Sequence, residues 1–146
     1  MKVTGENYDG LKSFWTKMLR SLHPGLFASG SGDDPVSVLE AYEAKSPSLA
    51  RKGLESALGD LLEETQDLSV EVVRSADQQL AEAGLPTLTQ VRLQFWKRIH
   101  AIMDRGRVRS ELEYHLMKNV ADGADEPQRA KAWAIIGAYE LKSSKL

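Results

Sequence analysis

Apolar residues recur at helical spacing along almost the whole chain, and this pattern most constrains what the chain can fold into. Between residues 11 and 22 they are spaced i, i+3, i+4 and i+7, which places them on one face of a helix. They are Leu11, Phe14, Trp15, Met18, Leu19 and Leu22. The strict alternation typical of a half-buried strand is almost absent. The pattern therefore predicts an all-α protein.

Capping residues divide this pattern into six or seven helices with short connections. Candidate helix starts have a side chain that can accept a hydrogen bond from the first turn, in two cases with proline at the first helical position. They are Asp34 with Pro35, Ser46 with Pro47, Ser69, Thr87 with Gln90, and Ser110 with Glu113. Glycines 84, 106 and 123 mark helix ends. Consecutive short-linked helices should pack as near-antiparallel neighbours in a bundle.

Two of these helices carry expectations about the core. A fifth helix should run from Thr87 to Gly106, with an inward stripe that includes Phe95. A last helix should begin near Asp125 and carry apolar residues along one side, and Trp133 on that side is expected in the core or at a pocket edge. The side comprises Ala130, Trp133, Ala134, Gly137 and Leu141.

The chain length fits one compact unit. A chain of 146 residues corresponds to a single domain, so we expect one compact helical bundle over residues 1–146. It is long enough to bury a core without a disulfide or a structural metal. The glycine-rich stretch at about 28–34 is expected to be a flexible loop, and residues 143–146 are expected to fray.

Composition excludes several classes of protein. The chain has no cysteine, which removes thiol catalysis, disulfides, zinc–thiolate sites and iron–sulfur clusters. The N-terminal stretch has no apolar signal region, and no run of about 18 apolar residues predicts a membrane span. We therefore expect a cytoplasmic protein that needs no membrane and no cofactor.

Charge is separated into two blocks, although the net charge is only −2. Residues 55–82 contain eight acidic residues and one basic residue, whereas residues 92–109 contain six basic residues and one acidic residue. Candidate partner-binding residues of the acidic block are Glu63, Glu64, Asp67 and Glu71. We refer to residues 55–82 as the acidic block and to residues 92–109 as the basic segment.

The stretch DRGRVRS, residues 104–110, places Arg105, Arg107 and Arg109 around Gly106, and three roles compete for these arginines. They can pair with the acidic block inside the fold. Such exposed ion pairs would orient the helices relative to one another more than they would stabilise the protein. They can hold an acidic protein or a small anion through bidentate guanidinium contacts. A helix–turn–helix reading is disfavoured, because the second helix opens with Glu111 and Glu113, which repel phosphate.

Trp96 lies next to Phe95, about 100° further round a helix, and this places it at the core boundary beside Arg92 and His100. Tryptophan and arginine are enriched at binding hot spots, so Arg92 and Trp96 are candidate partner contacts. The alternative is that a seventh helix covers Trp96.

Two histidine–carboxylate pairs are candidates for a metal site. His100 and Asp104, and likewise Glu111 and His115, are spaced i, i+4 on consecutive helices. A hairpin about Gly106 would bring two nitrogen and two oxygen ligands together, a set suited to zinc or iron. The further ligands typical of di-metal bundles are absent, so no bound metal is expected.

These observations favour a small, soluble, non-enzymatic binding or regulatory protein that acts through a helical surface. A neutralising, antitoxin-like protein, whose acidic block covers a basic partner, is one form of this hypothesis and rests on analogy alone. The alternatives are a metal-dependent enzyme built on the His/Asp/Glu cluster and a helix–turn–helix nucleic-acid binder. A protein is the preferred partner and a small anion the second choice.

Overall fold

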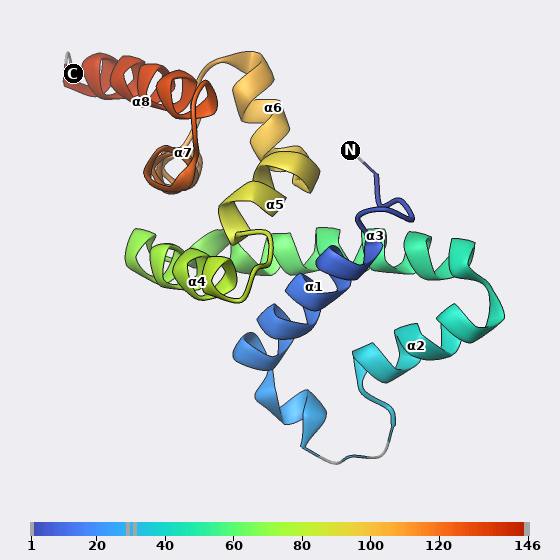
Figure 1. Cartoon of the computed structure of the whole chain (residues 1–146). Helices are drawn as coiled ribbons and strands as arrows, with labels where there is room; N and C mark the ends of the chain where they lie inside the picture. The colour runs from blue at the N-terminus through green and yellow to red at the C-terminus, as the bar shows by residue number, and fades with distance from the viewer. Residues whose placement is uncertain (1, 29, 31, 145–146) are drawn as a thin grey trace. The chain divides into compact units, whose positions relative to one another are not determined.

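The computed structural model describes residues 2–28, 30 and 32–144. Within these residues the regular secondary structure is entirely helical, with no strand (Figure 1). The all-α prediction is confirmed, with eight α-helices in this described part instead of six or seven. None of the described helices is long and apolar enough to cross a membrane. The expected flexible loop includes residues 29 and 31, and the expected frayed end includes residues 145–146, all of which lie outside the described residues.

The chain divides into two compact units, residues 1–62 and residues 63–146. The expectation of a single domain stays a prediction. The first unit comprises α1 (Tyr8–Leu22), the 3₁₀ turn η1 (Pro24–Phe27), α2 (Pro35–Lys45) and most of α3 (Pro47–Glu64).

The first unit is organised by the apolar stripe of α1. Leu11, Phe14, Trp15, Met18 and Leu19 are buried, which confirms the helical spacing seen in the sequence. A polar cluster joins α1 to α2, where the Tyr8 hydroxyl donates to Glu43 over 2.5 Å and the Lys12 ammonium lies 3.0 Å from the same carboxylate. The hydrogen bond from Tyr8 is the largest cause that lowers the pKa of Glu43.

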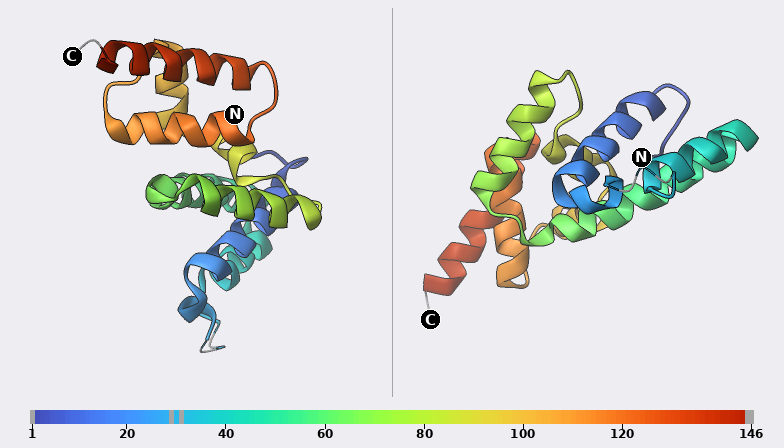
Figure 2. Two further views of the ribbon diagram at one scale, coloured as in Figure 1. Left: turned by 90° about the vertical axis from the view of Figure 1, so that its left-hand side faces the viewer. Right: turned by 90° about the horizontal axis from the view of Figure 1, so that it is seen from below.

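The second unit comprises η2 (Thr65–Asp67) and five α-helices: α4 (Val70–Glu82), α5 (Leu88–Phe95), α6 (Lys97–Arg105), α7 (Glu111–Gly123) and α8 (Gln128–Ser144). α7 and α8 lie side by side and antiparallel (Figure 2). The Tyr114 ring near the start of α7 lies 5.0 Å from the Tyr139 ring near the end of α8.

The predicted caps are present in this unit. Ser69 accepts from the Val72 N–H at 3.2 Å, and Thr87 with Gln90 forms a reciprocal capping box. Ser110 accepts from the Glu113 N–H at 3.2 Å. Gly106 ends α6 in the left-handed conformation with φ 77°, as a glycine at this position allows.

Two expectations about the core are wrong. The helix predicted from Thr87 to Gly106 is broken at Trp96, whose backbone is extended with φ −86° and ψ 109°. Trp133, which was expected in the core or at a pocket edge, is exposed on α8, and Ala132, Ile135 and Ile136 are buried instead.

Candidate functional site

The break between α5 and α6 reverses the expected positions of Phe95 and Trp96. Trp96 itself has the extended backbone, and its side chain is only 2% exposed, while Phe95, the last residue of α5, is half-buried. The break also removes the helical donor for the Leu93 carbonyl, and the His100 ring Nε2–H donates to that carbonyl instead. Trp96 is therefore covered, and the side chains that contact its indole are those of Glu63 and Arg92.

Arg92 is buried beside Trp96 and is only 1% exposed. Its Nη2 donates to the Thr65 carbonyl at 2.6 Å and to the Thr65 hydroxyl at 2.9 Å, and its guanidinium lies 5.0 Å from the Trp96 ring centroid. Burial lowers the pKa of Arg92 to about 10, because the charged form loses hydration. Arg92 and Trp96 therefore present no surface to a partner in this structure, contrary to the expectation of accessible contacts.

Glu63 joins the acidic block to the basic segment. Its carboxylate accepts from the Trp96 indole N–H at 2.7 Å and from Arg98 at 3.0 Å. The hydrogen bond from Trp96 is the largest cause that lowers the pKa of Glu63, and Arg98 adds to it. Internal pairing of the two blocks therefore occurs at this point, through Arg98.

The arginines of DRGRVRS divide into two groups. Arg105 is internal, because its Nη2 lies 2.5 Å from the Glu113 carboxylate and its Nε donates to the Arg107 carbonyl at 3.1 Å. Arg107 and Arg109 are exposed, and neither side chain has a hydrogen-bond or ion-pair partner among the described residues. Only these two arginines are available to a partner.

The remaining acidic candidates are exposed. Glu64 lies at the end of α3, while Asp67 and Glu71 line a pocket of about 360 Å³ together with His115. The buried Asn119 lines the same pocket and donates to the Leu68 carbonyl at 3.2 Å.

The four metal-site candidates are not brought together. His100 and Asp104 line one pocket, His115 lines the other, and Glu111 lines neither. Within the described residues, no group of three histidine, aspartate or glutamate side chains is placed to hold a metal ion.

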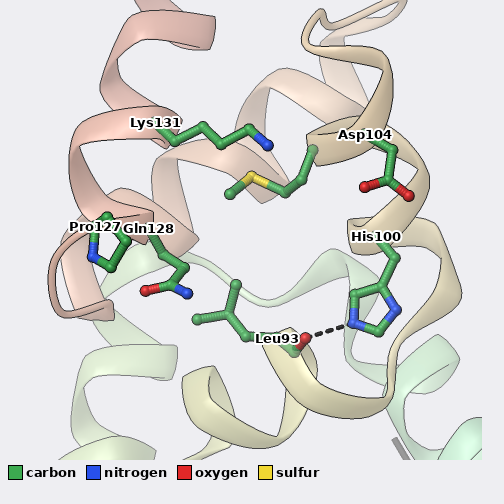
Figure 3. Close-up of a pocket in the computed structure, with 7 residues that line it drawn as sticks. Leu93, His100, Asp104, Pro127, Gln128 and Lys131 are labelled. Atoms are coloured by element: carbon green, nitrogen blue, oxygen red, sulfur yellow. Dashed lines mark hydrogen bonds between the residues drawn. The ribbon is translucent and has the colours of Figure 1, made fainter.

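The pocket beside His100 lies between three elements and has a volume of about 520 Å³. Figure 3 shows Lys131 and Gln128 on one side, Asp104 and His100 on the other, and Leu93 below. Met103 and Pro127 complete the lining. Of these residues, only His100 and Asp104 were singled out from the sequence.

The exposed face of α8 is the largest departure from the sequence expectations. Trp133 is 52% exposed, although it was expected in the core or at a pocket edge, and Leu141 on the same side of the helix is 61% exposed. Ala130, Ala134 and Gly137 of the same side are also exposed. The signal that could have revealed this face is that α8 is apolar on two opposite sides, of which α7 covers only one.

No family model, no curated protein and no solved structure matches this chain.

Proposed function

We propose that the protein is a non-enzymatic binding protein whose exposed α8 face receives an amphipathic helix of an acidic partner protein. The α8 face is defined here as Ala130, Trp133, Ala134, Gly137 and Leu141. It gives the helical surface expected from the sequence a specific location.

The exposure of Trp133 and Leu141 carries this proposal. They lie four residues before and four residues after Gly137, so all three share one side of the helix. A large indole and a leucine that are more than half exposed on one helix side form an apolar patch of the kind that marks interaction sites. Tryptophan is also among the residues most enriched at binding hot spots.

The shape of the α8 face suits a helical partner. Between the two large side chains the surface consists of Ala134 and Gly137, and Ala130 precedes Trp133, so a second backbone can approach closely. A Cβ added at Gly137 would meet nothing within 4 Å, so space inside the chain does not require glycine there. The two large residues would then pack on either side of the crossing point.

The charges beside the α8 face select an acidic partner. Lys131 and Lys142 lie about three turns apart and therefore share one edge of the face. The opposite edge carries Arg129 and Glu140, so basic residues outnumber acidic ones around the face. An apolar helix flanked by glutamates or aspartates would be complementary to this arrangement.

The same charges disfavour a second copy of this chain. An antiparallel pair centred on Gly137 would place Lys131 of one copy beside Lys142 of the other, on the same edge. These like charges would repel each other, and the repulsion would occur twice in a twofold-symmetric pair.

Arg107 and Arg109 add positive charge at one end of the α8 face. They immediately precede α7, and the Tyr114–Tyr139 contact shows that the start of α7 lies beside the end of α8. The exposed arginines therefore lie at the hairpin end that also carries Leu141. In this proposal they contact acidic residues of the partner, which answers the question that DRGRVRS raises.

Tryptophan fluorescence tests the proposal directly. Trp133 is exposed whereas Trp15 and Trp96 are buried, so acrylamide should quench mainly Trp133. Titration with a synthetic amphipathic peptide, with leucines along one side and glutamates on both flanks, should shift the emission to the blue and protect Trp133 from quenching. The affinity should fall as salt rises, because the flanking charges become screened.

Matched probes and variants define the outcomes. A peptide with the glutamates replaced by lysines should bind at least about tenfold more weakly, and Trp133→Glu should abolish binding of the acidic peptide. Equal binding of both peptides would contradict the acidic partner. A concentration-dependent dimer that is lost in Trp133→Glu would assign the α8 face to a second copy and overturn the proposal.

A further inference from the structure

The pocket beside His100 has the size of a small-molecule site. Its volume of about 520 Å³ lies within the range of roughly 300–1,000 Å³ that is typical of ligand pockets. It is lined by residues of α5, α6 and the start of α8, so three elements shape it. None of the five residues of the α8 face lines it, although Lys131 at the edge of that face does.

Three polar side chains that line this pocket have no partner among the described residues. Asp104, Gln128 and Lys131 form no side-chain hydrogen bond or ion pair with any described residue. All three side chains are exposed to solvent. Figure 3 shows Lys131 and Asp104 on facing sides of the pocket, and no ion pair joins them.

The rest of the lining is apolar or already engaged. Leu93, Met103 and Pro127 supply apolar surface. The His100 ring is held by its Nε2–H, which donates to the Leu93 carbonyl (Figure 3), so His100 acts as a fixed wall. A ligand would therefore meet one cation, one anion, one amide and an apolar surface.

We propose that this pocket binds a free apolar α-amino acid. The Lys131 ammonium would pair with the ligand carboxylate, and the Gln128 amide would donate a second hydrogen bond to it. The Asp104 carboxylate would accept from the ligand ammonium. The apolar side chain of the ligand would contact Leu93, Met103 and Pro127.

The facing charges are what select a zwitterion. A simple carboxylate attracted to Lys131 would be repelled by Asp104, and a simple amine attracted to Asp104 would be repelled by Lys131. A ligand that carries both charges satisfies both residues and keeps the net charge of the pocket unchanged. An apolar α-amino acid places its two charges at one end and its apolar group at the other, as the lining requires.

Isothermal titration calorimetry with L-leucine, L-methionine and L-phenylalanine tests the proposal. At least one of these amino acids should bind to the full chain with one site. Its amide, which lacks the carboxylate charge, and its N-acetyl derivative, which lacks the ammonium, should each bind at least about tenfold more weakly, the loss expected for a charge-assisted hydrogen bond.

Variants of Lys131 and Asp104 test the role of each charged residue in binding the amino acid. Lys131→Met and Asp104→Asn should each weaken amino-acid binding at least about tenfold. Exposed residues outside the pocket give matched controls, and Lys97→Met and Asp125→Asn should leave the affinity unchanged. Trp133→Glu should also leave it unchanged, so failure here is distinguishable from failure of the α8 face as a docking surface.

Three results would overturn the amino-acid site. The first is the absence of binding by all three amino acids. The second is equal affinity for an amino acid, its amide and its N-acetyl derivative. The third is an equal loss of affinity in the pocket variants and in their controls.

Discussion

The α5–α6 junction and the α8 helix each contain a tryptophan, and the two regions have opposite surroundings. Trp96 is 2% exposed, its indole N–H donates to Glu63, and the Arg92 guanidinium lies over its ring. Trp133 is 52% exposed and no hydrogen bond engages its indole in the described structure. The sequence suggested the reverse, with Trp96 at a boundary and Trp133 in the core.

The difference shows how much a side chain's position depends on where its helix is interrupted. In a continuous helix Phe95 would occupy the inward stripe, but the extended residue at position 96 turns the indole into the core. α8 has no such interruption, and its apolar residues lie on two opposite sides. Packing against α7 covers only one of them.

The largest expected effect is the difference in the free energy of unfolding between alanine variants of the two tryptophans. Trp96→Ala removes a buried indole and leaves a cavity, so it should lower the free energy of unfolding by about 3–5 kcal/mol. Trp133→Ala removes an exposed side chain and should change that free energy by less than about 1 kcal/mol. Urea denaturation followed by circular dichroism measures both values.

Similar losses for the two tryptophan variants would break the comparison. They would show that Trp133 is covered in solution as fully as Trp96. The acidic peptide should in turn stabilise the wild type and leave Trp133→Ala almost unaffected, because only the wild type keeps the hot-spot side chain.

A second, smaller effect compares two glycines. A Cβ at Gly123 would lie 2.8 Å from the Asp77 carboxylate, which already accepts from the Thr89 N–H and hydroxyl. Gly123→Ala should therefore destabilise the protein by about 1–3 kcal/mol. Gly137→Ala adds a methyl group to an open helix face and should stabilise it by about 0.5–1 kcal/mol. Thermal melts of both variants measure the sign.

The Gly137 variant also sharpens the docking proposal. If a partner helix crosses α8 at Gly137, the alanine should weaken binding of the acidic peptide while it raises the melting temperature. Unchanged affinity would show that the crossing point lies elsewhere on α8.

The smallest expected effect concerns the pH dependence of the Trp96 region. The pKa of Glu63 is lowered from its usual 4.5 because the Trp96 N–H, and then Arg98, favour the ionised carboxylate. The stabilisation is therefore present above pH 4.5 and is lost as the pH falls through the lowered pKa of the folded state. Glu63→Gln should be less stable than the wild type at pH 7, and the difference should shrink on acidification.

Urea denaturation at pH 7, 4.5 and 3 measures this difference for Glu63→Gln. The exposed Glu71→Gln is the matched control and should have little effect on stability at neutral pH. If Glu63→Gln lowered the free energy of unfolding by the same amount at all three pH values, the role of the ionised carboxylate would be contradicted.

The sequence alone determined the helical class and most of the helix ends, because both depend on local physical chemistry. Apolar spacing predicts helices, and the caps at Ser69, Thr87 and Ser110 satisfy backbone donors within three residues of themselves. α6 ends at Gly106, because glycine adopts the left-handed backbone conformation there without a steric penalty. These features need no knowledge of the rest of the chain.

Only the tertiary structure decided which apolar side of α8 is covered and which is exposed. It also decided that α5 ends at Phe95. No proline or glycine in the sequence marks this break, and the side chains that contact the residues around it, Glu63 and His100, lie in α3 and α6. Asp104 and Lys131 are 27 positions apart in the sequence, and they line one pocket because α6 and α8 both pack against α7. Such choices depend on contacts between distant residues, which local spacing does not encode.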